Sequence, residues 1–202
     1  MKRVCLFMTL ICMMMVSFKP DGSDGKHEGH EYVDLGLSVK WATCNVGATS
    51  PEEYGDYFAW GETSPKEKYT EKNSLTYGIQ MSDISGNAQY DAARANWGGD
   101  WRMPTDEEMQ ELIDECTWTW TTQNGVKGHK VTGPNGNSIF LPAAGSRDGS
   151  SLDDAGGSGY YWSSTPYGAL DDIAHGLSFL SGLHDMYYGS RDQGRSVRLV
   201  VE

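Results

Sequence analysis

The sequence contains little positive charge. Lysine and arginine together number 16, against 28 aspartate and glutamate residues, so the formal net charge is −12 at pH 7. A chain with this excess of carboxylates is repelled by phosphate backbones and by anionic lipid surfaces. The composition therefore argues against nucleic acid or a membrane surface as a partner, and it favours neutral or cationic ligands.

Cysteine is also scarce. Two of the 4 cysteines lie within the first eighteen residues, which leaves Cys44 and Cys116. No Cys-x-x-Cys motif is present, and one cysteine pair without suitably spaced histidines cannot form a tetrahedral zinc site. We therefore expect no metal site and no cofactor. An oxidising compartment would allow Cys44 and Cys116 to form a disulfide, and two small buried thiols are the alternative.

A nearly unbroken apolar run extends from Val4 to Val16, directly after the basic residues Lys2 and Arg3. This order is typical of a secretory signal peptide, and the run is shorter than the about 20 residues of a membrane-spanning helix. The sequence predicts a signal peptide over residues 1–18, a polar flexible leader over 19–30 and one domain over 31–202. We expect an exported protein in the periplasm, on the cell surface or outside the cell, without membrane insertion after signal cleavage.

Strand and turn signals are frequent in the predicted domain. The clearest is an alternation of Thr and Trp over residues 117–122, which the turn residues Asn124 and Gly125 follow. A hairpin is therefore expected to return through residues 126–131. Four further tryptophans are expected in the core or as hairpin supports, namely Trp41, Trp60, Trp101 and Trp162.

Helix signals are fewer. A capping box that begins at Thr105, followed by apolar residues at helical spacing, predicts a helix over residues 105–115. Ser50 followed by Pro51 has the order of a second, short helix start. Residues 61–89 lack periodicity and are expected to form a long polar connection. Several short antiparallel strands, two short helices and long loops together predict an α+β fold.

Five motifs occur in the order found in a known family. They are Val39–Gly47 (VKWATCNVG), Tyr57–Glu62 (YFAWGE), Trp101–Glu108 (WRMPTDEE), Tyr161–Ser164 (YWSS) and Ser196–Leu199 (SVRL). Together they resemble the Fibrobacter succinogenes major paralogous domain over residues 31–202. That family is similar in fold to C-type lectins and to formylglycine-generating enzymes, so the resemblance implies a C-type-lectin-like fold.

The resemblance transfers no catalytic or metal-binding residue. Formylglycine-generating enzymes bind copper through two neighbouring cysteines, whereas Cys44 lies early in this chain and Cys116 at the end of the predicted helix. The Glu-Pro-Asn, Gln-Pro-Asp and Trp-Asn-Asp triplets of calcium-dependent lectins are absent. No strand-turn-helix nucleophile elbow surrounds Ser163, so a triad with Asp171 and His175 is not expected. We therefore predict that the protein is not an enzyme.

The candidate ligand-binding residues lie in the C-terminal third, on a loop over Pro166–Asp172 and a hairpin over Leu183–Asp192. Tyrosine offers a large contact area at low entropic cost, and neighbouring charged groups supply hydrogen bonds. The frame around this region is similar to that of the variable proteins of diversity-generating retroelements. The candidates are Tyr167, Asp171, Asp172, His184, Asp185, Tyr187, Tyr188 and Arg191. The alternative is that the tyrosines only cap the domain.

The sequence thus predicts an exported, non-catalytic ligand-binding or adhesion module whose partner is a protein or a glycan, with a preference for protein. One alternative is an oxidase-like enzyme related to formylglycine-generating enzymes, which requires Cys44 and Cys116 to meet as thiols in a cleft. Another is a structural component of a surface appendage, for which an unpaired edge strand or an extended partner-binding groove is the expected sign.

Overall fold

The protein is rich in β-structure. The computed structural model describes residues 24–202, so the predicted signal peptide and the first part of the leader lie outside the described residues. Strands account for 42% of the structure and helices for 11%. The predicted α+β class is therefore wrong. Helical spacing of apolar residues is sustained over one ten-residue helix, whereas period-two segments and glycine turns recur along the chain.

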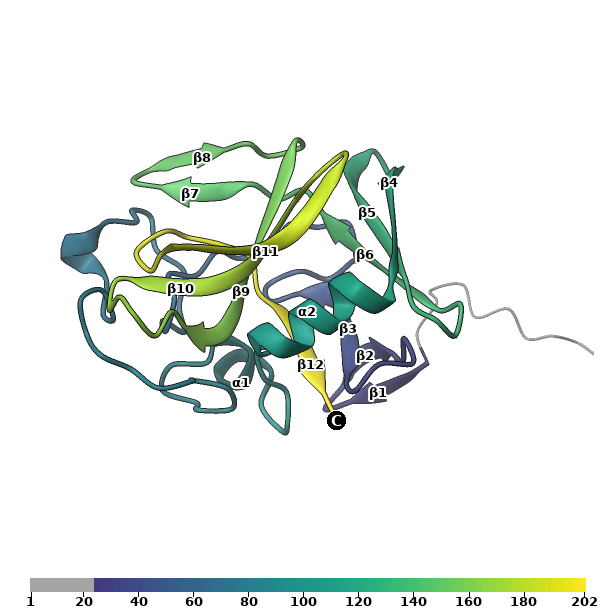
Figure 1. The fold of residues 1–202 in the computed structure, drawn as a ribbon, viewed down its shortest axis with the longest axis horizontal. Coiled ribbons are helices and arrows are strands. Elements are labelled where there is room, and N and C mark those ends of the chain that lie inside the picture. Colours follow the sequence, from purple (N-terminus) through teal and green to yellow (C-terminus); the bar gives the residue numbers. More distant parts are fainter. Residues whose placement is uncertain (1–23) are drawn as a thin grey trace, which may run out of the picture.

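Within residues 24–202, the named strands pair antiparallel in four sheets (Figure 1). The first, in the order β1-β2-β3-β12, contains β1 (Gly25–His27), β2 (His30–Val33), β3 (Lys40–Asn45) and β12 (Arg198–Val201). The second contains β4 (Thr117–Gln123), β5 (Val126–Thr132) and β6 (Ser138–Pro142). The third, in the order β11-β10-β9, contains β9 (Ser158–Pro166), β10 (Ile173–Leu180) and β11 (Leu183–Ser190). A two-stranded sheet pairs β7 (Ser146–Asp148) with β8 (Ser151–Asp153).

The helices are α1 (Ala92–Trp97), α2 (Asp106–Glu115) and the short 3₁₀ helix η1 (Glu71–Asn73). The predicted capping box is confirmed, because the Thr105 hydroxyl accepts the Glu108 N–H and the Glu108 carboxylate accepts the Thr105 N–H. The second predicted helix is wrong, because Ser50 and Pro51 lie in a turn. Among the helices of residues 24–202, none has the length and apolar character needed to cross a membrane.

The predicted hairpin is confirmed by β4 and β5. Asn124 and Gly125 adopt the positive φ angles of 47° and 86° that a two-residue hairpin turn requires. Trp41, Trp60, Trp101 and Trp162 are buried in the core, as predicted. The described residues form three buried clusters: one between α2 and the three-stranded sheets, one around α1 and β12, and a smaller one that contains Tyr57 and Tyr69.

The ordered structure begins earlier than the predicted boundary at residue 31. Strand β1 lies within the predicted leader and pairs with β2, which begins at the last leader residue, His30. The His27 carbonyl accepts a hydrogen bond from the Trp101 indole N–H at 3.0 Å. The His30 ring stacks on Trp97, with ring centroids 3.7 Å apart. The two histidines that composition placed in a linker are therefore packed against aromatic side chains.

The long connection between β3 and α1 is largely irregular and ends at Asp91. This buried carboxylate accepts the N–H groups of Ala93 and Arg94 at the start of α1 and those of Gly86 and Met103 from two other segments. One side chain thus joins the end of the connection to α1 and to the strand-like segment before α2.

Replacement of Asp91 by Ala is expected to lower the free energy of unfolding by about 2–5 kcal/mol, because four backbone N–H groups lose their acceptor in a buried site. Urea denaturation measures this loss. Glu115→Ala removes an exposed carboxylate from α2 and is expected to change stability by less than about 0.5 kcal/mol. Equal effects of the two variants would contradict this role for Asp91.

His129 on β5 is expected to make stability depend on pH. Its ring is buried among Trp118, Trp120 and Phe179, and this burial lowers the pKa of His129 below its usual value. The unfolded chain then binds a proton before the folded protein does, so stability falls as the pH drops below about 6.5. Denaturant midpoints between pH 7.5 and 5 should decline less in His129→Gln than in the wild type. An unchanged slope would contradict the assignment.

Candidate functional site

The C-terminal hairpin brings Tyr167 and Tyr188 into contact. Tyr188 lies opposite His175 in the β10–β11 ladder, and the loop after β9 returns Tyr167 toward both. The two tyrosine rings stack with centroids 5.0 Å apart, and the His175 ring lies 5.4 Å from that of Tyr167. Tyr188 is 57% exposed, so this stack faces solvent. The loop over residues 166–172 and the hairpin over residues 183–192 therefore meet at Tyr167 and Tyr188.

Tyr187 lies beside this stack, and its ring packs on the Arg195 guanidinium. Its ring is parallel to that of Tyr188, with centroids 6.3 Å apart, and it is 39% exposed. Below it, the Arg195 guanidinium lies 4.8 Å from the Tyr187 ring and 4.1 Å from the buried Trp162 ring. Burial lowers the pKa of Arg195 to about 10, so the guanidinium remains charged at neutral pH. The stacked cation fixes the ring of Tyr187 from beneath.

Arg191 is a structural anchor, contrary to its predicted role in ligand binding. Its side chain is 1% exposed and stacks over Trp60 at 4.4 Å. The guanidinium donates to the carbonyls of Ile173, Thr76 and Ile79 at 3.0, 3.2 and 2.7 Å. From sequence, a charged residue in a loop is expected to be exposed. Here the three carbonyls accept the hydrogen bonds of the guanidinium, so the side chain can be buried.

The other four candidates are dispersed. Asp171 is exposed and Asp172 half-buried, and their backbone carbonyls accept the N–H groups of Gly78 and Arg191. Asp185 is exposed, and its carboxylate accepts the N–H of Met186 at 2.8 Å. His184 stacks on Trp118, with ring centroids 4.7 Å apart, so it packs toward the β4-β5-β6 sheet and not toward the tyrosines.

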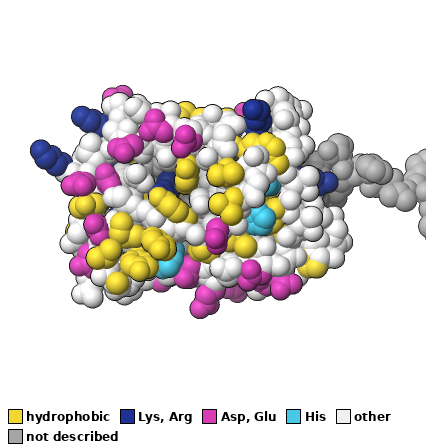
Figure 2. Space-filling view, turned by 45° about the horizontal axis from the view of Figure 1, so that its top comes forward, with side chains coloured by type: hydrophobic (Ala, Val, Ile, Leu, Met, Phe, Trp, Pro, Cys, Tyr) yellow, Lys and Arg dark blue, Asp and Glu magenta, His cyan; other side chains and the backbone are white. Residues whose placement is uncertain are grey.

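The structure adds residues that sequence reasoning missed. Leu170 in the loop and Leu183 at the hairpin tip are 52% and 56% exposed. Five of the eight large apolar side chains exposed in residues 24–202 lie between residues 166 and 192. Figure 2 shows hydrophobic side chains gathered into patches on this side of the molecule, with carboxylates at their margins. We refer to Tyr167, Leu170, Tyr187 and Tyr188 as the tyrosine face.

A groove of about 480 Å³ lies between α2 and the hairpin. Helix α2 contributes Asp106, Glu107, Gln110, Glu111 and Asp114, and the sheet contributes His175 and Met186. Four of these seven residues are carboxylates and none is lysine or arginine. Because His175 also touches Tyr167 and Tyr188, the groove is continuous with the tyrosine face. The spacing of the acidic residues in the sequence indicates an acidic face on α2. Only the fold shows that His175 and Met186 lie opposite this face.

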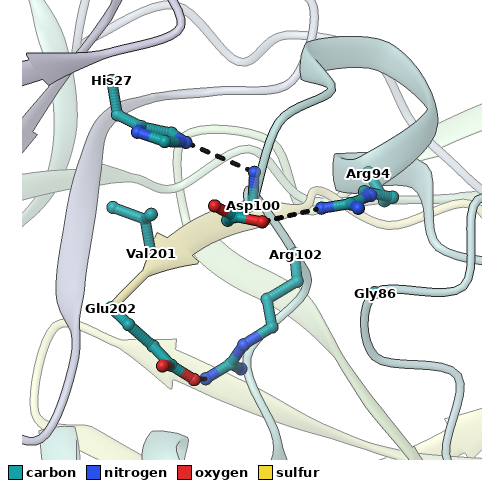
Figure 3. Close-up of a pocket in the computed structure, with 7 residues that line it drawn as sticks. All are labelled: His27, Gly86, Arg94, Asp100, Arg102, Val201 and Glu202. Atoms are coloured by element: carbon teal, nitrogen blue, oxygen red, sulfur yellow. Dashed lines mark hydrogen bonds and ion pairs between the residues drawn. The ribbon is translucent and has the colours of Figure 1, made fainter.

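A second cleft, of about 340 Å³, is lined by charges that are already paired (Figure 3). Arg94 lies 3.5 Å from Asp100, and Arg102 binds both carboxylate oxygens of Glu108 and lies 3.9 Å from Glu202. His27 accepts the N–H of Asp100 at 3.3 Å. Each arginine already has a carboxylate partner. This cleft therefore has fewer unpaired charges for an ionic ligand than the acidic groove has.

Cys44 and Cys116 are free thiols, so the predicted disulfide is not formed in the structure. Cys44 lies on β3 in a cleft beside Lys26 and Trp97, whereas Cys116 directly follows α2 and packs against the core cluster that contains Met109 and Leu112. Burial raises the pKa of the Cys116 thiol to about 11. The sequence does not show how far apart they lie, because only the fold places β3 and the end of α2 relative to each other.

The residues considered for a serine triad are not assembled for that chemistry. The buried Ser163 hydroxyl donates to the backbone carbonyl of His175 at 3.0 Å, and so it is held by the ladder between β9 and β10. Within residues 24–202, no group of three or more His, Cys, Asp or Glu side chains is placed to hold a metal ion.

Gly189 is expected to be sensitive to substitution because a Cβ there would collide with the Arg195 guanidinium. Gly189→Ala should lower the free energy of unfolding by about 1–3 kcal/mol. Gly182 in the hairpin turn has open space around its Cβ position, so Gly182→Ala should change stability by less than about 0.5 kcal/mol. Thermal denaturation of both variants makes the comparison, and equal midpoints would refute the packing of Arg195 beneath the hairpin.

A family model describes most of the chain. The model of the Lcl C-terminal domain matches residues 32–201, which include every strand from β3 to β12 and both α-helices. No curated protein and no solved structure gives a significant match. The extent of the family match shows that this chain belongs to the Lcl C-terminal domain family.

Proposed function

We propose that this protein is a non-catalytic binding module that recognises another protein through the tyrosine face. The observation that carries the proposal is the exposure of Tyr187, Tyr188 and Leu170 on one hairpin and its neighbouring loop. Aromatic side chains dominate the binding energy of many protein interfaces when they are held rigidly. Here Tyr187 rests on Arg195 and Tyr188 stacks on Tyr167, so both rings are ordered before a partner arrives.

A protein partner is favoured over a glycan by the neighbours of the tyrosines. Leu170 in the loop and Leu183 at the hairpin tip present exposed aliphatic surface, which provides no hydrogen bonds for sugar hydroxyls. Such side chains are suited to the apolar centre of a protein interface, which in a complex of ordinary size buries about 800 Å² per partner. Acidic groups at the margin would steer a partner of opposite charge.

An export signal in residues 1–18 and a location in the periplasm, at the cell surface or outside the cell belong to the same proposal. Membership of the narrower Fibrobacter succinogenes major paralogous group is also proposed, on the strength of the five ordered motifs. An oxidase-like activity finds no support in the placement of Cys44 and Cys116, because Cys44 lines a cleft that does not include Cys116, which packs against the core beside α2.

A parallel screen of a random peptide library and a glycan array tests the proposal. Wild-type protein is expected to select peptides that bind at least about tenfold more weakly to Tyr167→Ser/Tyr188→Ser. Leu152→Ser, which removes an exposed apolar side chain from β8, is the matched control and should leave binding unchanged. Selected peptides that bind the double variant as tightly as the wild type would refute the tyrosine face, and selection of glycans alone would refute a protein partner.

A further inference from the structure

Strand β11 is the edge of its sheet, and its outward backbone groups are largely unpartnered. β10 and β11 are joined by a two-residue turn, with Leu180 opposite Leu183. In such a hairpin, residues 183, 185, 187 and 189 exchange hydrogen bonds with β10, so His184, Met186 and Tyr188 direct their N–H and C=O groups away from it. Within residues 24–202, the Met186 N–H alone among these outward groups has a partner, the Asp185 carboxylate.

The open edge adjoins the acidic groove. Met186 and His175 form the sheet side of the groove, and α2 forms the other side with Asp106, Glu107, Glu111 and Asp114. Figure 1 shows α2 running beside this sheet. An additional strand on β11 would therefore place every second side chain over four carboxylates, since side chains directly opposite one another in an antiparallel pair share a face.

One end of the groove is aromatic. Tyr188, with Tyr167 stacked on it and His175 opposite, lies two residues beyond Met186 on the same face of the strand. Side chains two residues apart on a strand are separated by about 6.8 Å. If one side chain of an added strand contacts the α2 carboxylates, the next side chain on the same face would lie at Tyr188. A cationic side chain there would be attracted to the π system of the tyrosine ring.

We propose that the β11 edge and the α2 groove bind an extended basic peptide, which pairs antiparallel with His184, Met186 and Tyr188 and directs alternate Lys or Arg side chains into the groove. This proposal rests on the proposed function and names the chemistry of its partner. Charge complementarity selects this occupant: a second copy of the chain has a net charge of −12 and would bring an identical acidic groove against this one. A glycan offers no repeating amide to pair with the edge.

The probe is the synthetic peptide acetyl-Thr-Lys-Val-Lys-Val-Lys-Thr-amide. Residues directly opposite His184, Met186 and Tyr188 both exchange hydrogen bonds with them and point into the groove. N-methylation of the Lys residues therefore removes the ladder, whereas N-methylation of the Val residues leaves it intact. Isothermal titration of the three peptides is expected to show binding of the parent and the Val-methylated form, and a loss of at least about tenfold for the Lys-methylated form.

The groove is tested with a charge-matched pair of variants. Glu107→Gln/Asp114→Asn removes two exposed carboxylates that line the groove, and Glu67→Gln/Glu115→Gln removes two exposed carboxylates elsewhere. The first variant should weaken binding by about tenfold more than the second, and the difference should shrink with added salt.

Failure of the parent peptide to bind, equal binding of both methylated forms, or equal effects of the two charge variants would each overturn this inference. These results leave the proposed function intact if library-selected peptides still depend on Tyr167 and Tyr188. If selected peptides ignore those tyrosines, the proposed function itself falls.

Discussion

Three buried arginines near the C terminus hold the rest of the structure together. Arg198 donates to Asn45, Ala42, Thr43 and Phe140, and so joins β12 to β3 and β6. Arg195 lies between Trp162 and Tyr187, and Arg191 lies on Trp60 while binding three loop carbonyls. None of the three has a carboxylate partner among its hydrogen bonds. Backbone carbonyls accept from Arg191 and Arg198, whereas Arg195 has the Gln193 amide and three aromatic rings around a guanidinium whose Nε and Nη1 make no hydrogen bond.

This arrangement explains how a surface suited to binding is kept rigid. The loop that carries Tyr167 is tied to β11 through Arg191, and Tyr187 rests on Arg195. The exposed rings therefore lose little conformational freedom when a partner binds, which is the principal advantage of a preorganised interface. The same sheet leaves β11 open at its edge beside the carboxylates of α2, so shape, hydrogen-bonding groups and charge converge on one side of the molecule.

Local signals in the sequence predicted local structure well. The capping box at Thr105 and the Asn124–Gly125 turn each depend on neighbouring residues, and both are confirmed. The α+β class was wrong because antiparallel strands recur along the chain, whereas helical spacing of apolar residues is sustained over α2 alone among the described residues. Arg191 was misjudged because its partners, Thr76 and Ile79, lie more than one hundred residues away. The acidic groove needs the packing of α2 against β11, which no local pattern specifies.

Residue-resolved amide hydrogen exchange of the free protein tests most directly the claim that buried arginines support an open recognition edge. The account predicts slow exchange for Arg191, Arg195 and Ser196, whose N–H groups bond to backbone carbonyls, and fast exchange for His184 and Tyr188 beside protected neighbours on β11. Uniform protection along β11 would show that its edge is closed. Fast exchange at Arg191 and Arg195 would show that residues 191–195 do not hold the β10–β11 hairpin rigid.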